Sequence, residues 1–387
     1  MTTGEATIIG GNRLVLIEEG PRRLSSLLDL IDGARDRLCL YYYIFAADAV
    51  AEQVRDALVM ALRRGVAVTL MIDAFGSGRT PDPFFDSFVA AGGRFGRFGT
   101  RRSTRYLIRN HQKMAIADGV RAVVGGFNVE QGYFAEGDDR LGWCDLALRI
   151  EGAAVGDLQR WYDGLARWVQ DGDQGFRSLR RLVREWRPER GSLLWLVGGP
   201  ARHLSGWARA VKADLEQGSR LDMVAAYFSP GRGMLRRITR IARRGDARLI
   251  VPLLSDNTMT IGAARHLYHR MIRRGVILYE YACCKLHMKL IVIDDIVYVG
   301  SANFDKRSLF INVEIMLRVE DAAFAEGVRQ LVVRRERESR RIDRTAYRQM
   351  AGPLARLRWL VSYLLVGVMD YTVTRRLNFR GEPRSNV

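Results

Sequence analysis

The sequence predicts an α/β protein built from two similar halves. Its 387 residues are enough for two domains of ordinary size, and 48% of them are apolar, so each half can bury a core. The segments LCLYYYIFAADAVAEQVRDALVMALRRGVAVTLMIDAFGS and LDMVAAYFSPGRGMLRRITRIARRGDARLIVPLLSD are diverged copies of one pattern. Each copy predicts a strand, a helix and a strand, which is typical of parallel strands joined by a covering helix. Three anchors align the copies: Tyr43 with Tyr227, Gly65 with Gly245, and His111 with His287.

The first copy illustrates how the elements are predicted. The apolar run 38–45 indicates a buried strand, and Asp48 is suited to cap the helix that follows. Apolar residues recur at helical spacing over 50–62. Gly65 is suited to the position just after a helix end, and the run 66–72 predicts the next buried strand.

Composition shifts mark the ends of the two halves. The stretch QDGDQGFRSLRRLVREWRPERGS is polar and basic and contains Pro188, as is typical of a linker. After residue 319 the sequence becomes helical in pattern and strongly basic. We therefore expect a first domain at 1–175, a second domain at 190–335 and a basic, amphipathic helical tail at 336–387.

The charge narrows the classes of partner. Lys and Arg number 61 against 43 Asp and Glu, a net charge of +18, which favours nucleic acid or anionic lipid surfaces. The four cysteines form no CxxC pair, so neither a zinc site nor a disulfide framework is expected. Residues 1–20 lack the pattern of a secretory signal. No window approaches the roughly 20 apolar residues of a membrane-spanning helix.

Two segments repeat the same scarce residues in the same order. HQKMAIADGVRAVVGGFN and HMKLIVIDDIVYVGSAN both contain H-x-K-x4-D, a short strand and G-[GS]-x-N. The chain has only five histidines and five lysines, so chance does not explain the repetition. The residues that carry the pattern are His111, Lys113, Asp118 and Asn128 in the first segment, and His287, Lys289, Asp294, Ser301 and Asn303 in the second.

The spacing predicts a shared pocket. Residues two apart on a strand point to the same face, so each His projects beside its Lys. Two copies facing each other place two His, two Lys and two Asn around one anion. Asp118 and Asp294 fall at turns, so we assign them a supporting role within the site. We expect the small residue of G-[GS]-x-N to let a phosphate approach, with Ser301 or the asparagines donating hydrogen bonds.

This set of residues suits phosphodiester chemistry without a metal ion or cofactor. One imidazole attacks phosphorus and forms a phosphohistidine, and the other protonates the leaving alkoxide and then deprotonates the incoming alcohol. Lysines and asparagines bind the non-bridging oxygens. Each imidazole needs a carboxylate on its other nitrogen. The candidates are Asp145 and Glu314, which follow the two motifs at equivalent places.

The paired motifs and their surroundings resemble the phospholipase D superfamily. The stretches YYYIFAAD, AAYFSP, GVILYEY and INVE extend the resemblance, more narrowly, to the bacterial cardiolipin synthases, in a short form without N-terminal transmembrane helices. The resemblance implies two pseudo-twofold-related α/β/α sandwich domains with the active site at their interface. It also implies transfer of a phosphatidyl group from one phosphatidylglycerol to another with release of glycerol, and a first-motif nucleophile, His111.

Alternatives remain open at this point. A phospholipase D-type phosphodiesterase hydrolysing phospholipid or nucleic acid also fits the motifs, and the charge favours it. A binding protein without catalysis would not need both histidines. We find no nucleic-acid-binding module, so no nucleic acid partner is expected. The acceptor (phosphatidylglycerol, phosphatidylethanolamine, another alcohol or water), the nucleophilic histidine and the oligomeric state are left open.

The tail provides a candidate membrane contact. Residues 359–369 are mostly apolar and are flanked by Arg356, Arg358, Arg375 and Arg376. As a helix they cover roughly 16 Å, too short to span a ~30 Å hydrocarbon core but suited to lie in the interface with arginines on anionic headgroups. Packing on the protein's own core is the alternative. We expect a peripheral protein on the cytoplasmic face of the cell membrane that binds anionic phospholipids such as phosphatidylglycerol.

Overall fold

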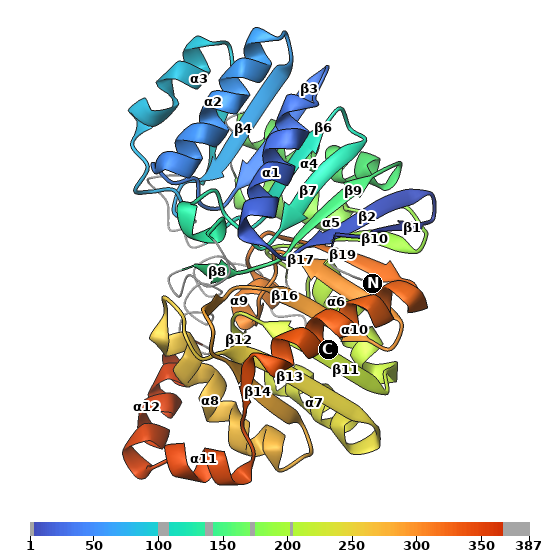
Figure 1. Ribbon diagram of the computed structural model, residues 1–387, viewed down its shortest axis with the longest axis vertical. Helices are drawn as coiled ribbons and strands as arrows, with labels where there is room; N and C mark the ends of the chain where they lie inside the picture. Colours follow the sequence, from blue (N-terminus) through green and yellow to red (C-terminus); the bar gives the residue numbers. More distant parts are fainter. Residues whose placement is uncertain (1–3, 100–107, 136–141, 171–174, 202–203, 367–387) are drawn as a thin grey trace.

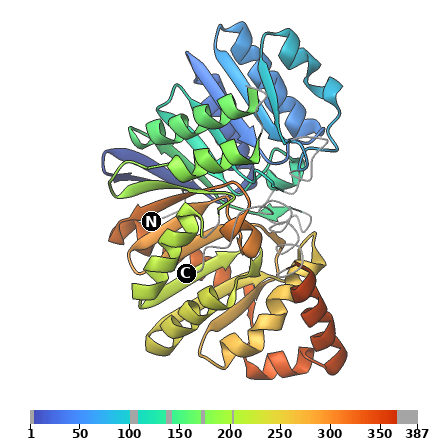
Figure 2. The same ribbon diagram turned by 180° about the vertical axis from the view of Figure 1, so that it is seen from behind.

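The chain folds into two halves of similar architecture, stacked one above the other (Figure 1). The computed structural model describes residues 4–99, 108–135, 142–170, 175–201 and 204–366. Each half is built on an eight-stranded mixed sheet flanked by helices, and the view from behind shows the same stacking (Figure 2). The expected fold class, two similar α/β domains, is confirmed.

The first sheet has the strand order β1-β2-β9-β7-β6-β3-β4-β5. Strands β3, β4 and β5 run parallel to one another, and the other neighbours are antiparallel. The bounds are β1 Ala6–Ile9, β2 Asn12–Ile17, β3 Arg37–Tyr42, β4 Ala67–Asp73, β5 Arg94–Phe98, β6 Lys113–Ala117, β7 Arg121–Gly125 and β9 Ala147–Glu151.

The second sheet repeats this order over seven strands, as β10-β19-β17-β16-β11-β13-β14, with β20 added at the far edge. Its strands pair in the same directions as their counterparts, so β6 corresponds to β16 at the centre of each sheet. The bounds are β10 Leu193–Gly198, β11 Arg220–Ala225, β13 Asp246–Pro252, β14 Ile277–Tyr281, β16 Lys289–Ile293, β17 Ile296–Gly300, β19 Glu314–Glu320 and β20 Ser339–Arg341. Four two-residue strands lie outside both sheets: β8 Trp143–Cys144, β12 Phe228–Ser229, β15 Lys285–Leu286 and β18 Phe304–Asp305.

Helices cover both faces of each sheet. In the first half α1 and α2 pack on the outer face, while α4 packs on the face turned toward the second half. The second half places α6, α7 and α8 outside and α10 inside. The bounds are α1 Gly20–Asp32, α2 Ala49–Arg63, α3 Asp86–Ala90, α4 Ala154–Gln170, α5 Phe176–Glu185, α6 Gly206–Gln217, α7 Arg232–Arg244, α8 Thr258–Ile272, α9 Lys306–Phe310, α10 Ala322–Arg337, α11 Arg344–Met350 and α12 Pro353–Leu364, with single 3-10 turns η1 Asp82–Phe85 and η3 Gln131–Tyr133.

The elements predicted for the first copy are found close to their expected places. The side chain of Asp48 accepts a hydrogen bond from the Ala51 amide at 2.9 Å and so caps α2. Gly65 follows the end of α2 with φ +92°, a left-handed conformation that glycine adopts without a Cβ clash. Strand β3 ends at Tyr42, earlier than the predicted residue 45, because the chain there leaves the sheet.

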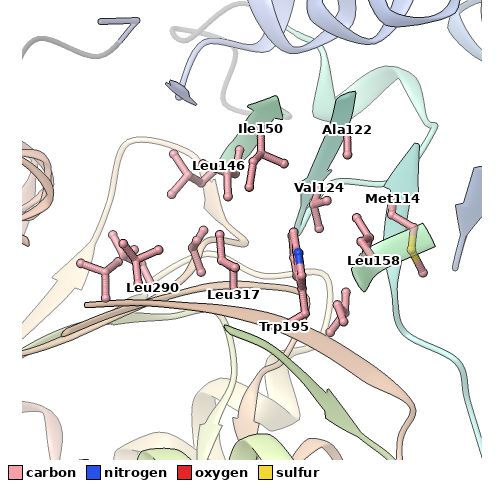
Figure 3. Close-up of a cluster of buried hydrophobic side chains, with 14 of the residues drawn as sticks. Met114, Ala122, Val124, Leu146, Ile150, Leu158, Trp195, Leu290 and Leu317 are labelled. Atoms are coloured by element: carbon pink, nitrogen blue, oxygen red, sulfur yellow. The ribbon is translucent and has the colours of Figure 1, made fainter. Parts of the chain in front are cut away.

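The two inner faces share one hydrophobic core. Side chains of the first sheet, including Val124 and Ile150, face side chains of the second, including Leu290 and Leu317, and Trp195 lies between them (Figure 3). All five are at least 98% buried. Because this core is continuous, the two halves form a fixed frame in which segments distant in sequence can be placed precisely against each other.

The C-terminal elements continue the second half past residue 335, where we expected it to end. Strand β20 pairs with β14, and α12 packs against α8. The two helices approach so closely that a Cβ on Gly262 would lie 2.6 Å from Ser362 Oγ. Trp359, in the stretch expected at a membrane interface, is 3% exposed in the second-half core. Arg375 and Arg376 lie outside the described residues.

Candidate active site

Both histidine motifs begin at the same place in their sheets. His111 and His287 lie two residues before the central strands β6 and β16, and Lys113 and Lys289 are the first residues of those strands. The ammonium group of each lysine donates a hydrogen bond to the backbone carbonyl of the histidine two residues earlier. The strand spacing thus holds each His–Lys pair together, as the motif spacing predicts.

The segment before each motif pairs with the other half of the molecule. The His111 amide donates to the Val313 carbonyl at 2.8 Å, and the His287 amide donates to the Cys144 carbonyl, also at 2.8 Å. Strand β15 runs parallel to β8, which belongs to the first half by sequence. These exchanged backbone contacts bring the two histidine rings to a centroid distance of 6.5 Å.

Each histidine also receives its supporting carboxylate from the other half of the molecule. Asp145, from the first half, accepts a hydrogen bond from His287 Nδ1 at 2.7 Å. Glu314, from the second half, lies 3.4 Å from His111 Nδ1, which is also 3.0 Å from the Ser301 carbonyl. Carboxylate and carbonyl oxygens only accept, so Nδ1 carries the proton in both rings, and Nε2 of each neutral ring keeps its lone pair.

The small residue of G-[GS]-x-N makes room for the carboxylate, rather than for a phosphate as we expected. A Cβ on Gly126 would lie 2.4 Å from Asp145 Oδ1. At the equivalent position of the second half, the Ser301 hydroxyl donates to Glu314 Oε2 at 2.5 Å, and Ser308 donates to Glu314 Oε1 at 2.7 Å. Ser301 is fully buried and does not line the cavity between the histidines.

Burial sets the protonation of the site. It lowers the pKa of His111 to about 4 and that of His287 to about 3, and the neighbouring lysine adds to each shift. Burial also lowers the pKa of Lys289 to about 8, although Asp145 and Glu314 oppose the shift. Burial alone would raise the pKa of both carboxylates, but the adjacent His and Lys hold each one below its ordinary value. At neutral pH both imidazole rings are therefore uncharged, and the carboxylates of Asp145 and Glu314 are ionised.

The two histidines line one cavity of about 470 Å³. Its wall includes the predicted Asn128 and Asn303 together with three arginines, Arg79, Arg109 and Arg307, and two acids, Asp256 and Asp305. Two buried lining atoms, Asn303 Oδ1 and Asn312 Oδ1, have no hydrogen-bond partner among the described residues. Such acceptors are normally satisfied, so these two oxygens are suited to accept hydrogen bonds from hydroxyl groups of a ligand, while the three arginines are suited to its anionic groups.

Asp118 and Asp294 do not join this site. Each lies in the turn at the opposite end of the β6 or β16 strand, with φ +55° and +47°. The Asp118 carboxylate accepts hydrogen bonds from the amides of Arg35, Asp36 and Arg37, and Asp294 accepts from those of Ser219 and Arg220. Both aspartates therefore fix the turn that leads into the neighbouring strand, a structural role at a distance from the histidines.

Comparisons with known proteins agree with this architecture. A family model described as "Cardiolipin synthase, PLD-like domain" matches residues 27–147 and 212–334. The chain belongs to this phospholipase D-like family. The resemblance seen in the motifs is thereby confirmed, and the two matched segments correspond to the two halves of the structure.

Individual members of this family extend the comparison. Cardiolipin synthase A of Pseudomonas entomophila is 28% identical over 85% of this chain and 69% of its own length. Cardiolipin synthase B of Salmonella typhimurium is 28% identical over 82% of this chain and 79% of its own length. Phosphatidylserine synthase of Haemophilus influenzae has a similar fold, with a TM-score of 0.73, 13% identity, and coverage of 94% and 95% of the two chains.

Several residues of this phospholipase D-like site were not predicted from the sequence. Arg23, 1% exposed, donates to the backbone carbonyls of Asp145, Tyr133 and Trp143 and so fixes the segment between β8 and β9 that carries Asp145. The ring of Tyr43 lies 4.8 Å from that of His111. Tyr43 is an anchor of the internal repeat, which is the signal that could have indicated its place. Nothing local in the sequence marks Arg23.

Proposed function

We propose that this chain is a phosphatidyltransferase that acts as a cardiolipin synthase, transferring a phosphatidyl group from one phosphatidylglycerol to a second and releasing glycerol. The observation that carries the proposal is the pair of crossed dyads, His111 with Glu314 and His287 with Asp145, whose rings share one cavity at 6.5 Å. The names of the family model and of the most similar relatives support the substrate class.

In the first step His111 is the nucleophile. Its Nε2 lone pair attacks phosphorus of the donor, and the P–O bond to the glycerol headgroup breaks as His287 gives the proton on its Nε2 to the departing alkoxide. His287 takes that proton from solvent before the first turnover and from the acceptor hydroxyl in each later one. The Asp145 carboxylate at 2.7 Å stabilises the imidazolium form of His287 that this transfer requires. That direct charge contact supports His287 as the acid, since Nδ1 of His111 lies closer to a neutral carbonyl.

In the second step His287 acts as a base. It removes the proton from a hydroxyl of the acceptor phosphatidylglycerol, whose oxygen attacks phosphorus while the P–N bond to His111 breaks. Lys113, Lys289 and the cavity asparagines would hold the non-bridging oxygens as charge develops on them. The residues implied by this mechanism need neither metal nor cofactor. Among the described residues, no cluster of three His, Cys, Asp or Glu side chains is placed to hold a metal ion.

The cavity chemistry supports an alcohol as acceptor. Arg79, Arg109 and Arg307 line the cavity and bring positive charge to phosphate groups, while Asp256 and Asp305 line it with carboxylates that can accept hydrogen bonds from glycerol hydroxyls. We further propose that the protein works as a peripheral protein at the cytoplasmic face of the cell membrane. None of the described helices has the length and apolar character needed to span a bilayer.

Incubation of the purified full chain with phosphatidylglycerol labelled in the acyl chains tests the reaction. Cardiolipin and free glycerol in equal amounts, unaffected by EDTA, are the expected products. If phosphatidic acid is the only lipid product, the protein is a hydrolase and the proposed transfer is wrong. If the protein cleaves DNA and does not turn over lipid, it is a nuclease. The control is Asp163→Asn, because Asp163 lies on α4, pairs with Arg37 and does not line the cavity; this variant should retain the wild-type rate.

A further inference from the structure

Helix α12 turns its apolar side chains outward. Its buried positions include Trp359 and Ser362, which face α8, whereas leucines and a valine on the other side are 38–80% exposed. Their spacing forms one stripe along the helix. The members of this stripe are Leu354, Leu357, Leu360, Val361, Leu364 and Leu365. These are six of the thirteen large apolar side chains that the described residues expose, so the exposure is concentrated.

A cationic hollow adjoins the beginning of this stripe. Its volume is about 440 Å³, and it lies between the end of α8, helix α11 and the start of α12. Four exposed arginines line it: Arg273, Arg344, Arg348 and Arg356. In the part of the chain that the structure describes, none of them forms an ion pair with a carboxylate. We call the apolar stripe and these four arginines the α12 platform.

The platform leads to the mouth of the catalytic cavity. Helix α12 packs along α8, and Val366, just past its end, lines that cavity together with Asn257 and Thr260 at the start of α8. Three further exposed apolar side chains belong to this cavity wall or neighbour it in sequence: Phe75 lines the cavity, Leu254 lies two residues before Asp256, and Met259 precedes Thr260. Figure 1 shows α8, α11 and α12 gathered at the outer end of the second half. One surface therefore joins the cationic hollow, the apolar stripe and the cavity mouth.

We infer that the α12 platform is the surface through which this protein binds an anionic lipid bilayer, with the apolar stripe inserted among the headgroups and the arginine hollow around a lipid phosphate. The helix, about 18 Å long, is too short to span a bilayer and suits the interface. Unpaired arginines complement anionic headgroups. The placement of the cavity mouth over the bilayer rests on the proposed function; the binding surface itself does not.

Co-sedimentation with vesicles tests the stripe without any turnover. The double variant Leu357→Glu with Val361→Glu should bind phosphatidylglycerol-containing vesicles at least about 10-fold more weakly than wild type, because two carboxylates would have to enter the interface. The matched control is Met60→Glu, a similarly exposed apolar residue on α2, which should bind like wild type. Unchanged binding of the double variant, or equal loss in the control, would overturn the inference.

Charge variants test the hollow separately. Arg273→Ser with Arg348→Ser should weaken binding to phosphatidylglycerol vesicles by about 5-fold per arginine and leave binding to phosphatidylcholine vesicles unchanged. Arg63→Ser, at an exposed position of α2, is the control. Equal loss on both kinds of vesicle would show that the hollow does not bind anionic headgroups. Thermal melting of each variant detects misfolding. If the wild-type protein dimerises and the double variant Leu357→Glu with Val361→Glu does not, the platform binds a second copy of the chain and the inference is wrong.

Turnover separates this inference from the proposed function. For the double Glu variant, the rate on vesicles should fall at least about 10-fold more than the rate on short-chain phosphatidylglycerol below its micelle concentration. A wild-type protein that binds vesicles through the platform but makes no cardiolipin would contradict the proposed function and leave the platform in place. Normal synthesis on vesicles by the double variant would contradict the platform alone.

Discussion

The two halves of the site have the same backbone and different chemistry. In one, the Asp145 carboxylate contacts His287 directly at 2.7 Å, and a glycine leaves space for it. In the other, the Ser301 carbonyl is the nearest acceptor for His111 Nδ1 at 3.0 Å, with Glu314 at 3.4 Å. Duplication thus supplies two equivalent positions for histidine, and single side chains beside them create the difference.

The surroundings of the rings differ as well. His287 lies among Tyr133, Trp143 and Tyr227, at centroid distances of 5.2, 5.2 and 6.4 Å. His111 has Tyr43 at 4.8 Å, and the Lys113 ammonium lies 5.0 Å from the centre of that ring. A two-step transfer uses one nucleophile and one acid–base group, and the side chains around the rings give the two histidines different surroundings for these roles.

Removing either histidine gives the largest expected effect. His111→Ala and His287→Ala should each lower cardiolipin formation by at least about 1,000-fold, because a nucleophile or a general acid is lost. A donor with a p-nitrophenol leaving group separates the roles, since this group departs without a proton. His287→Ala should still release one equivalent of p-nitrophenol, and His111→Ala should release none.

If His111→Ala releases p-nitrophenol and His287→Ala does not, His287 is the nucleophile and His111 is the acid. A full burst from both variants would remove the two-histidine mechanism, and mapping the phosphohistidine in His287→Ala checks the first assignment directly.

Replacing the carboxylate that lies closer to its histidine should lower kcat more than replacing the other one. Asp145→Asn should lower kcat by about 100-fold and Glu314→Gln by about 10-fold, because outer carboxylates orient and charge-stabilise the ring they contact, and Asp145 is closer. Steady-state rates on phosphatidylglycerol measure both. Asp163→Asn, which changes a partly exposed acid paired with Arg37, is the control.

Gly126→Ala tests the Asp145 contact independently. The added Cβ would lie 2.4 Å from Asp145 Oδ1 and displace it, so a loss close to that of Asp145→Asn is expected. A larger effect of Glu314→Gln than of Asp145→Asn would invert the ranking of the two dyads, and a fully active Gly126→Ala would contradict the need for the Asp145 contact.

Only part of this site could be predicted from the sequence, for physical reasons. The motifs and the equivalent places of Asp145 and Glu314 follow from local patterns, which predict strands and repeats. The exchange of carboxylates between halves depends on contacts such as His287 to Cys144, which form only when the shared core docks the two sheets. Helical spacing likewise predicts the stripe of α12 but not that Trp359, rather than the leucines, faces the protein.

Lys289 provides a pH test of intermediate size. The Lys289 ammonium has a pKa of about 8 because burial disfavours its charge, so it loses its proton as the pH rises through that value. Phosphate binding in the free enzyme weakens accordingly, and kcat/KM should fall by about 10-fold per pH unit above about 8. A profile on monomeric short-chain substrate measures it; a flat profile from pH 7 to 10 would contradict a charged Lys289 in substrate binding.

The serine that distinguishes the halves should give the smallest effect. Ser301→Ala removes a hydrogen bond to Glu314 Oε2, the oxygen that faces His111, whereas Ser308→Ala removes the bond to Oε1. Each should lower the free energy of unfolding by about 1–2 kcal/mol, measured by urea denaturation, because a buried carboxylate loses a donor. Only Ser301→Ala should also lower kcat, by about 3-fold. Equal rates in the two variants would mean that the orientation of Glu314 does not matter to His111, and that the asymmetry between the dyads resides in Asp145 alone.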